Sequence, residues 1–238
     1  SCPAAVEPNS AAMRPPKGAL MDQYVISHAP VFLMDEADPF PILLVGCTVF
    51  DAPAMSKTVQ GLLIDPAEWG ARRIIEYALY FDYDIQHLYD LEHAWVLLDE
   101  TDHLMGCWSS YHGLRMNSSG LPNLYRTEAG RPVLYLEPGK HALLPDPSLF
   151  GLHVDYPACC NRHCGGGLLI PSFLRDQLHS TPEQDETIRA SMRKTFSFTP
   201  SELYHPVALA PEQFVSADTL LARLPALVRA QQQIILGV

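Results

Sequence analysis

The densest group of chemically active side chains lies between residues 80 and 95, where the sequence reads Tyr-Phe-Asp-Tyr-Asp-Ile-Gln-His-Leu-Tyr-Asp-Leu-Glu-His-Ala-Trp. Carboxyl and imidazole groups bind metal ions and move protons. Twelve consecutive positions hold six of them, namely Asp82, Asp84, His87, Asp90, Glu92 and His93. Aromatic and β-branched residues, which favour β-strands, precede and follow this group. The stretch therefore predicts a metal site or an acid–base site that is carried by strands.

The two-residue repeat of a β-strand decides which of these side chains can act together. Side chains two positions apart lie on one face of a strand, about 7 Å apart, so Asp90 and Glu92 share a face. His87 has the wrong parity for that face and reaches it only if the chain turns between residues 85 and 89. We therefore expect two strands joined by a loop, with the acidic cluster at the end of the loop.

Carboxylates that share a face repel each other, and they stay ionised only if a cation or several hydrogen-bond donors lie between them. Oxygen-rich sites with one or two imidazoles suit Mg, Ca or Mn, and suit Zn less well. The cluster therefore predicts a bound Mg, Ca or Mn ion. The alternative is a solvated acidic loop in which His87 and His93 are ordinary half-buried residues.

Two histidines farther along the chain are candidates for the same site. His112 ends the strand that should pair with residues 92–98, and a short hairpin would bring it back toward Glu92. His141 follows the next predicted strand and lies between a Gly-Lys pair and a small Ala. We predict that His112 and His141 act as general acid or base, although either could be an ordinary loop histidine.

Other motifs offer weaker alternatives. Ser109 and Ser110 lie near His112, but the Gly-x-Ser-x-Gly motif of many serine hydrolases is absent. The cysteines of residues 159–164 lack the paired Cys-x-x-Cys spacing of structural zinc sites, so local disulfides or thiols are favoured there. The glycines of residues 165–167 are not followed by the Lys-Ser/Thr pair of a phosphate-binding loop.

Charge and hydropathy exclude some classes of partner. The 238 residues carry a net charge of 16 − 27 = −11, which argues against non-specific binding of nucleic acid and against electrostatic docking to anionic lipid. No apolar run is long enough for a transmembrane segment. The longest, residues 41–50, is interrupted by Gly46 and reads as a buried strand. We expect a small-molecule, glycan or lipid-headgroup ligand, and the oligomeric state stays open.

The N-terminal sequence and the cysteines give expectations about domain organisation and location. Residues 1–20 are rich in Ala, Pro and Ser and predict a flexible N-terminal arm, followed by a single domain over residues 21–238. This start resembles that of a mature exported protein. Six cysteines could form up to three disulfides or remain largely as buried thiols. We therefore expect a secreted or periplasmic protein.

Strand patterns dominate the first two thirds of the chain, and helix patterns follow. Strands are expected at residues 24–33, 42–50, up to 84, 92–98, 104–111 and 132–136. Helices are expected at residues 65–73, 181–194 and 216–235, the last with a break before Pro225. This order predicts an α+β fold with a central β-sandwich flanked by helices.

The order of these motifs resembles that of the necrosis-and-ethylene-inducing-peptide-like proteins (NLPs) and of the related fungal vacuolar-sorting-associated family. That superfamily carries the heptad Gly-His-Arg-His-Asp-Trp-Glu, preceded by Tyr-Phe-x-x-Asp and followed by Ser-x-His-Gly and Gly-x-His-Ala. The corresponding segments here are residues 80–84, 86–92, 110–113 and 139–142. The similarity covers roughly residues 24–170, and it implies an NLP-like β-sandwich.

The resemblance also implies a set of metal ligands. In the NLP cytolysins the heptad segment holds a divalent cation that grips a sphingolipid sugar headgroup. The ligand positions carry over onto Asp84, His87, Asp90 and Glu92. The chain departs from the heptad where its leading Gly, second His and Trp are replaced by Gln86, Tyr89 and Leu91, so the toxin activity is not carried over.

Three functions follow from a cation in this cluster. The first is a metal-dependent hydrolase, in which the ion polarises an ester, phosphoryl or glycosidic oxygen and activates water. The second is a non-enzymatic protein that binds a glycan or sphingolipid headgroup through the cation. The third is a purely structural ion.

Overall fold

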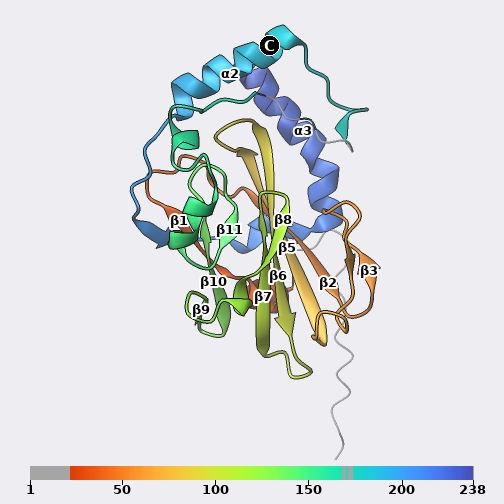
Figure 1. The fold of residues 1–238 in the computed structure, drawn as a ribbon. Helices are drawn as coiled ribbons and strands as arrows, with labels where there is room; N and C mark the ends of the chain where they lie inside the picture. Colours follow the sequence, from red (N-terminus) through yellow and green to blue (C-terminus); the bar gives the residue numbers. More distant parts are fainter. Residues whose placement is uncertain (1–21, 168–169, 171–173, 238) are drawn as a thin grey trace, which may run out of the picture.

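The structure, a computed structural model, describes residues 22–167, 170 and 174–237. Two mixed β-sheets and a few helices make up an α+β fold. Figure 1 shows helices α2 (Pro182–Phe196) and α3 (Ala217–Leu236) meeting at one end of the molecule, beyond the ends of the long strands. The predicted fold class is confirmed at the level of α+β.

The larger sheet has six strands in the order β13-β2-β5-β6-β7-β8. Strand β13 is parallel to β2, and all the other neighbours are antiparallel. In chain order the strands are β2 (Leu44–Phe50), β5 (Arg73–Tyr83), β6 (Leu88–Leu98), β7 (Leu104–Tyr111), β8 (Leu114–Asn117) and β13 (Phe214–Ser216). The acidic stretch thus spans the end of β5, the connecting loop and the first half of β6.

The smaller sheet has the order β11-β10-β1-β12, and β9 pairs with β10. Its strands are β1 (Val31–Asp35), β9 (Arg126–Glu128), β10 (Arg131–Leu136), β11 (Leu143–Leu144) and β12 (Tyr204–Pro206). The remaining elements are short: α1 (Gln23–His28), the pair β3 (Ala54–Met55) and β4 (Leu63–Ile64), and the 3₁₀ turns η1 (Ser118–Gly120), η2 (Pro147–Leu152), η3 (Ala158–Cys160) and η5 (Pro211–Gln213).

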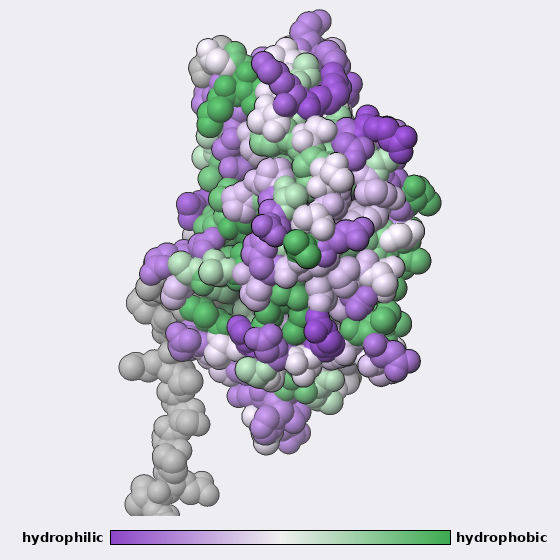
Figure 2. All heavy atoms as spheres, turned by 90° about the vertical axis from the view of Figure 1, so that its left-hand side faces the viewer, coloured by the Kyte–Doolittle hydropathy of each residue, from purple (hydrophilic) through white to green (hydrophobic). Residues whose placement is uncertain are grey.

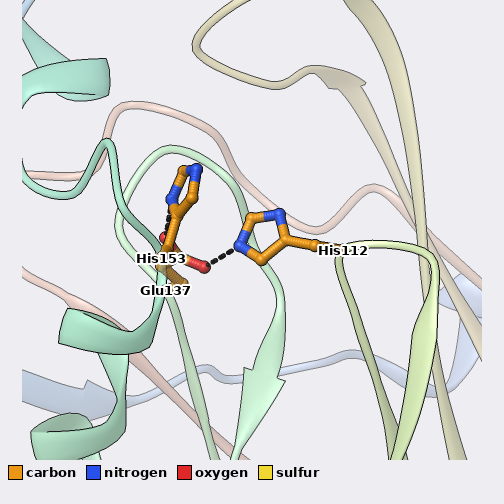
Figure 3. Close-up of side chains that lie close together, drawn as sticks. All are labelled: His112, Glu137 and His153. Carbon is orange, nitrogen blue, oxygen red and sulfur yellow. Dashed lines mark hydrogen bonds and ion pairs between the residues drawn. The ribbon is translucent and has the colours of Figure 1, made fainter.

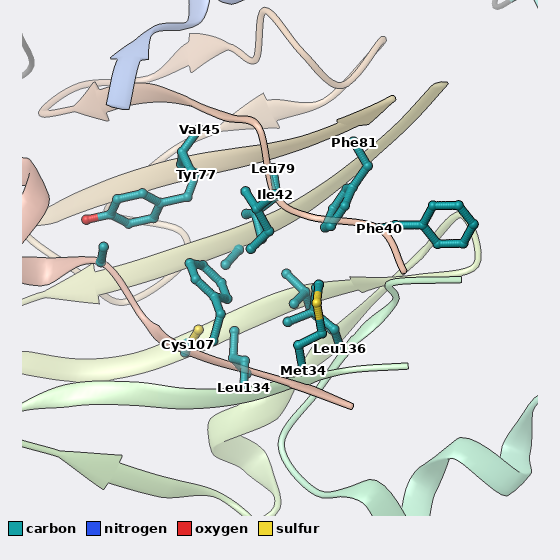
Figure 4. Close-up of a cluster of buried hydrophobic side chains, with 14 of the residues drawn as sticks. Met34, Phe40, Ile42, Val45, Tyr77, Leu79, Phe81, Cys107, Leu134 and Leu136 are labelled. Carbon is teal, nitrogen blue, oxygen red and sulfur yellow. The ribbon is translucent and has the colours of Figure 1, made fainter. Parts of the chain in front are cut away.

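The main hydrophobic cluster contains residues from both sheets (Figure 4). Alternation along β6 explains how this strand contributes. Ala94 and Val96 join the main cluster, whereas Trp95 and Leu97 join a separate cluster with Trp69 and other residues on the opposite face. Both faces of β6 are therefore covered, and the side chains near its start lie on either side of the larger sheet.

Helix α3 covers part of the larger sheet. Leu220, Leu224 and Val228 are buried against Ala78 and Tyr80 of β5, as expected for the apolar stripe of an amphipathic helix. The backbone of β2 approaches this helix closely, because a Cβ atom at Gly46 would lie 2.5 Å from the Leu220 side chain. The leucine stripe is therefore part of the core.

Helix α2 begins where the sequence predicts. Thr181 and Gln184 form a reciprocal capping box, and Pro182 occupies the first turn. Only Ile188 and Met192 of this helix are fully buried. The side that faces the solvent is strongly polar, as the purple upper part of Figure 2 shows.

Three local predictions are wrong. Residues 24–33 are not one strand, because Asp22 caps the short helix α1 before β1 begins. Residues 65–73 form hydrogen-bonded turns that end at Gly70, with φ 72°, instead of a helix. Helix α3 continues through Pro225 without the expected break, since its packing against β5 outweighs the lost backbone hydrogen bond.

The cysteines of the described residues are all buried thiols, and no disulfide joins any of them. Cys2 and the predicted N-terminal arm lie outside the described residues. Among the helices of the described ranges, none is both long and apolar enough to cross a bilayer.

Replacing Pro225 by Ala is expected to increase the free energy of unfolding by about 1–3 kcal/mol, because the new N–H can join the hydrogen-bond ladder of α3. Chemical denaturation measures this change. Pro182→Ala is the matched control, since a proline in the first turn costs a helix little. Equal effects of the two substitutions would contradict a continuous α3.

Candidate metal centre and acidic cavity

The acidic stretch lines a cavity of about 380 Å³, which we call the acidic cavity. It is formed by Thr58, Asp84, His87, Tyr89, Asp90, Leu91, Glu92, His93, His112, Gly113 and Lys140. All four predicted metal ligands and His112 are among these residues. His141 is not, and its side chain is fully buried nearby. The structure thus brings the predicted ligands and His112 together around one cavity. That these residues bind a metal ion stays a prediction.

A tight loop between β5 and β6 holds Asp84. The Asp84 carboxylate accepts backbone hydrogen bonds from Gln86 at 2.7 Å and His87 at 2.8 Å, and the Asp84 N–H donates to the His87 carbonyl at 3.0 Å. These bonds close the turn that strand parity predicts between residues 85 and 89.

Asp84 already has cationic partners within the protein. The Lys140 ammonium donates a hydrogen bond to Asp84 Oδ2, and His87 Nε2 lies 3.1 Å from the same oxygen. Burial alone would raise the pKa of Asp84, but the charges of His87 and Lys140 and their hydrogen bonds lower it. Part of the role predicted for a metal ion is therefore taken by Lys140.

His141 links Asp90 to a second buried carboxylate. His141 Nδ1 lies 2.9 Å from Asp90 Oδ2, its Nε2 lies 3.7 Å from Asp38 Oδ1, and its ring stacks on Phe81. Burial would lower the pKa of His141, but the charges of Asp38 and Asp90 and the hydrogen bond with Asp90 outweigh it and raise the pKa to about 10. His141 is therefore an imidazolium at neutral pH that fixes Asp90, and its burial suits it to positioning rather than to contact with a ligand.

Glu92 differs from its neighbour Asp90. Burial and the negative charge of Asp90 raise the pKa of Glu92 well above its usual value, and a hydrogen bond from Ser110 offsets this only in part. The Ser110 hydroxyl in turn accepts a hydrogen bond from the His93 N–H at 2.7 Å. The cavity thus contains one carboxylate paired with an imidazolium and one carboxyl group that holds its proton more tightly, an arrangement that suits acid–base chemistry.

His93 lies on the other face of β6, as strand parity predicts. Its Nε2 lies 3.1 Å from the Thr58 hydroxyl, and its ring stacks on Trp95. Burial lowers the pKa of His93 to about 3, so the imidazole is neutral at physiological pH.

A second cluster joins the rim of the cavity to the smaller sheet. His112 Nε2 lies 2.6 Å from Glu137 Oε2, and His153 Nδ1 lies 2.6 Å from Glu137 Oε1 (Figure 3). The Glu137 side chain is fully buried. Three possible ligand atoms of these residues lie within 4.8 Å of one another. His112, Glu137 and His153, here called the His-Glu-His cluster, could hold a metal ion.

Turns at the ends of strands position this cluster. His112, with φ 45°, and Gly113 form the tight turn between β7 and β8. Glu137 directly follows β10, and its carbonyl accepts the His141 N–H at 2.7 Å. His153 ends η2. A positive φ costs a residue other than glycine about 1–3 kcal/mol. It occurs here at His112, His141 and Tyr89, and elsewhere in the described chain at Asp102, Ala129 and Glu202.

Only one member of the His-Glu-His cluster, His112, is identified from the sequence. Glu137 could have been identified from the sequence, because a carboxylate that directly follows the buried residues 132–136 lies at a buried strand end. His153 has no such signal, since it lies in an irregular segment without periodicity. Lys140 belongs to the Gly-x-His-Ala turn, but its pairing with Asp84 requires two distant loops to meet.

Comparisons with known proteins give no relative for this chain. No family model, no curated protein and no solved structure matches it.

The Asp38→Asn substitution is expected to lower the pKa of His141, because it removes one of the two charges that hold the imidazolium. A folded-state pKa raised above the unfolded value gives stability that is present below about pH 6.5 and is lost as the pH rises toward 10. The Asp38→Asn variant should lose this stability at lower pH than the wild type.

NMR titration of the His141 ring and denaturation at several pH values measure both effects. Glu36→Gln is the matched control, because Glu36 is an exposed acid in the same turn. A His141 pKa near 6.5 in the wild type would contradict the account of this ion pair.

Proposed function

We propose that the protein is a divalent-metal-dependent hydrolase in which the His-Glu-His cluster holds the ion and the acidic cavity binds the substrate. The observation that carries the proposal is the meeting of two imidazoles and a buried carboxylate at the rim of this cavity. His112 belongs to both, since it lines the cavity and lies 2.6 Å from Glu137.

The donor set suits a catalytic transition metal. Two histidines and one glutamate are the protein ligands of several zinc hydrolases, in which the remaining position is open to water or substrate. Donor atoms around one tetrahedral zinc ion lie about 3.4 Å apart. Each imidazole nitrogen, now 2.6 Å from a Glu137 oxygen, would therefore move about 1 Å away from that oxygen and exchange its hydrogen bond for a bond to the ion. Zinc therefore fits this cluster better than the Mg, Ca or Mn expected for the oxygen-rich residues.

The metal ion and the residues of the acidic cavity would have different roles in hydrolysis. A bound zinc ion polarises a carbonyl or phosphoryl oxygen and lowers the pKa of water. Glu92, with its raised pKa, would take up and return a proton. Lys140 and His141 would hold the Asp84 and Asp90 side chains in place. His112 then serves as a ligand instead of the general acid or base expected from the sequence.

A second candidate function follows from the resemblance to the NLP cytolysins. In this alternative the ion is bound by Asp84, His87, Asp90 and Glu92 and grips a glycan or lipid headgroup without chemistry. The supporting observation is that all four residues line one cavity. The pairing of Asp84 with Lys140 weighs against it, since an ion would have to displace the ammonium group. An NLP-like packing of the two sheets as a sandwich, and an exported location, belong to this proposal.

Zinc is expected to bind the His-Glu-His cluster with one ion per chain and to raise the melting temperature. His153→Ala should weaken binding by more than about tenfold, because it removes a direct ligand. Competition with a chromophoric chelator measures the affinity. His163→Ala is the matched control, since His163 also pairs with a carboxylate, Asp155, at 2.5 Å but lies outside the cluster. Equal zinc affinity in both variants would contradict the proposed ion site.

Hydrolysis of aryl esters, aryl phosphates or aryl glycosides is expected only in the zinc-loaded protein. Glu92→Gln should reduce kcat by about 100-fold or more while zinc affinity persists, because it removes the acid–base group but no ligand of the cluster. Glu128→Gln, at an exposed position, is the control. Stoichiometric zinc without turnover on any substrate would reject the hydrolase. Metal-dependent glycan binding that is lost with Asp90→Asn would favour the second candidate.

A further inference from the structure

A second cavity lies near the other end of the β6–β7 strand pair. It has a volume of about 500 Å³, larger than the acidic cavity, and we call it the tryptophan cavity. Its lining residues are Glu68, Trp69, Gly70, Leu97, Met105, Gly106, Trp108, Arg115, Asn117 and Ser119. Trp69, Leu97 and Trp108 belong to the cluster on the sheet face that points away from the main core. Pockets of about 300–1,000 Å³ with aromatic walls and a few polar groups typically bind small molecules.

Two half-buried indoles form a fixed apolar wall. The ring centroids of Trp69 and Trp108 lie 5.5 Å apart, and Trp69 also packs edge-on against the fully buried Trp95. Glycine at position 106, which pairs with Leu97, lets Ser119 pack closely against β7, because a Cβ atom there would lie 2.6 Å from the Ser119 hydroxyl. The wall therefore offers rigid indole surface at little cost in side-chain entropy.

Polar groups surround this wall without being paired to each other. Within the described part of the chain, the Glu68 carboxylate has no hydrogen-bond or ion-pair partner, and the contact of Arg115 is with the Trp69 ring at 5.7 Å. Asn117 uses its side-chain oxygen for Ser119 and Gly120, so its amide N–H₂ group remains a donor. Glu68 and Arg115 are the only charged lining residues, so the lining carries no net charge.

These features exclude several kinds of ligand. A flat heteroaromatic ring cannot be sandwiched between the two indoles, because Trp69 and Trp108 are tilted by 41° and contact each other. A cation seated on the aromatic wall would be repelled by Arg115, which lies over Trp69. A purely apolar ligand would use none of the exposed carboxylate, guanidinium and amide groups of the lining, and covering them without partners would be costly.

We propose that the tryptophan cavity binds a neutral pyranose sugar. One face of a pyranose ring presents C–H groups that pack on an indole, and its rim carries hydroxyls that can donate to Glu68 and accept from Arg115 and Asn117. This site is separate from the proposed hydrolase centre, and it requires no metal ion.

Titration with free D-glucose, D-galactose, D-mannose, N-acetylglucosamine and cellobiose, in the presence of a chelator, tests the proposal. At least one of these sugars should shift the indole N–H resonances of Trp69 and Trp108 saturably in NMR spectra of the full chain. Arg115→Met, which retains much of the packing on Trp69, and Trp108→Ala should each weaken binding at least tenfold. Arg223→Met, an exposed arginine on α3, should leave it unchanged.

The proposal is overturned if none of these sugars shifts either resonance, or if Arg115→Met binds as well as the wild type. Because Arg115→Met alters only an exposed side chain, it tests the site even if Trp108→Ala fails to fold. Sugar binding that appears only after zinc is added, and that is lost with His153→Ala, would assign the sugar to the hydrolase centre and would likewise overturn this site.

Discussion

Buried carboxylates must be matched by positive charge or by hydrogen-bond donors, and this requirement organises the region between the two sheets and the loop after β5. Taking an unpaired charge out of water costs several kcal/mol. In this region, cationic side chains of the protein itself pair with the carboxylates. The turn at residues 137–142 supplies most of the groups involved, since Lys140 pairs with Asp84 and His141 lies between Asp38 and Asp90. At Glu137, at the start of the same turn, the arrangement is the opposite, because one carboxylate lies between two imidazoles.

Because of this pairing, some charged residues of the cavity are already bound to a partner of opposite charge, whereas Glu92 has no such partner among the described residues. Asp84, Asp90 and His141 are bound to one another or to Lys140, so they act chiefly to set the field of the cavity. Glu92 shares a face of β6 with Asp90, and burial, together with the charge of Asp90, raises its pKa. The alternation of β6 then contributes to two cavities, with the acidic residues near its start and the tryptophan cavity at Leu97 near its end.

Local chemistry explains what the sequence could predict. Strand parity places Asp90 and Glu92 together and requires the loop after Asp84, because both depend only on backbone geometry over a few residues. The capping box of α2 is equally local. Residues 65–73 carry a helix prediction because Asp-Pro-Ala-Glu is a good start signal, yet Gly70 ends the turn before a helix forms. His153 and Lys140 could not be assigned, since their partners come from segments that meet only in the folded chain.

The central claim is that two imidazoles and the buried Glu137 form the metal centre beside the acidic cavity. Anomalous diffraction at the zinc absorption edge, from a crystal of the full chain grown with zinc, tests it most directly. The account predicts one strong peak within about 2–2.2 Å of His112 Nε2, Glu137 and His153 Nδ1. A peak among Asp84, Asp90 and Glu92 instead, or none at the three predicted atoms, would contradict it.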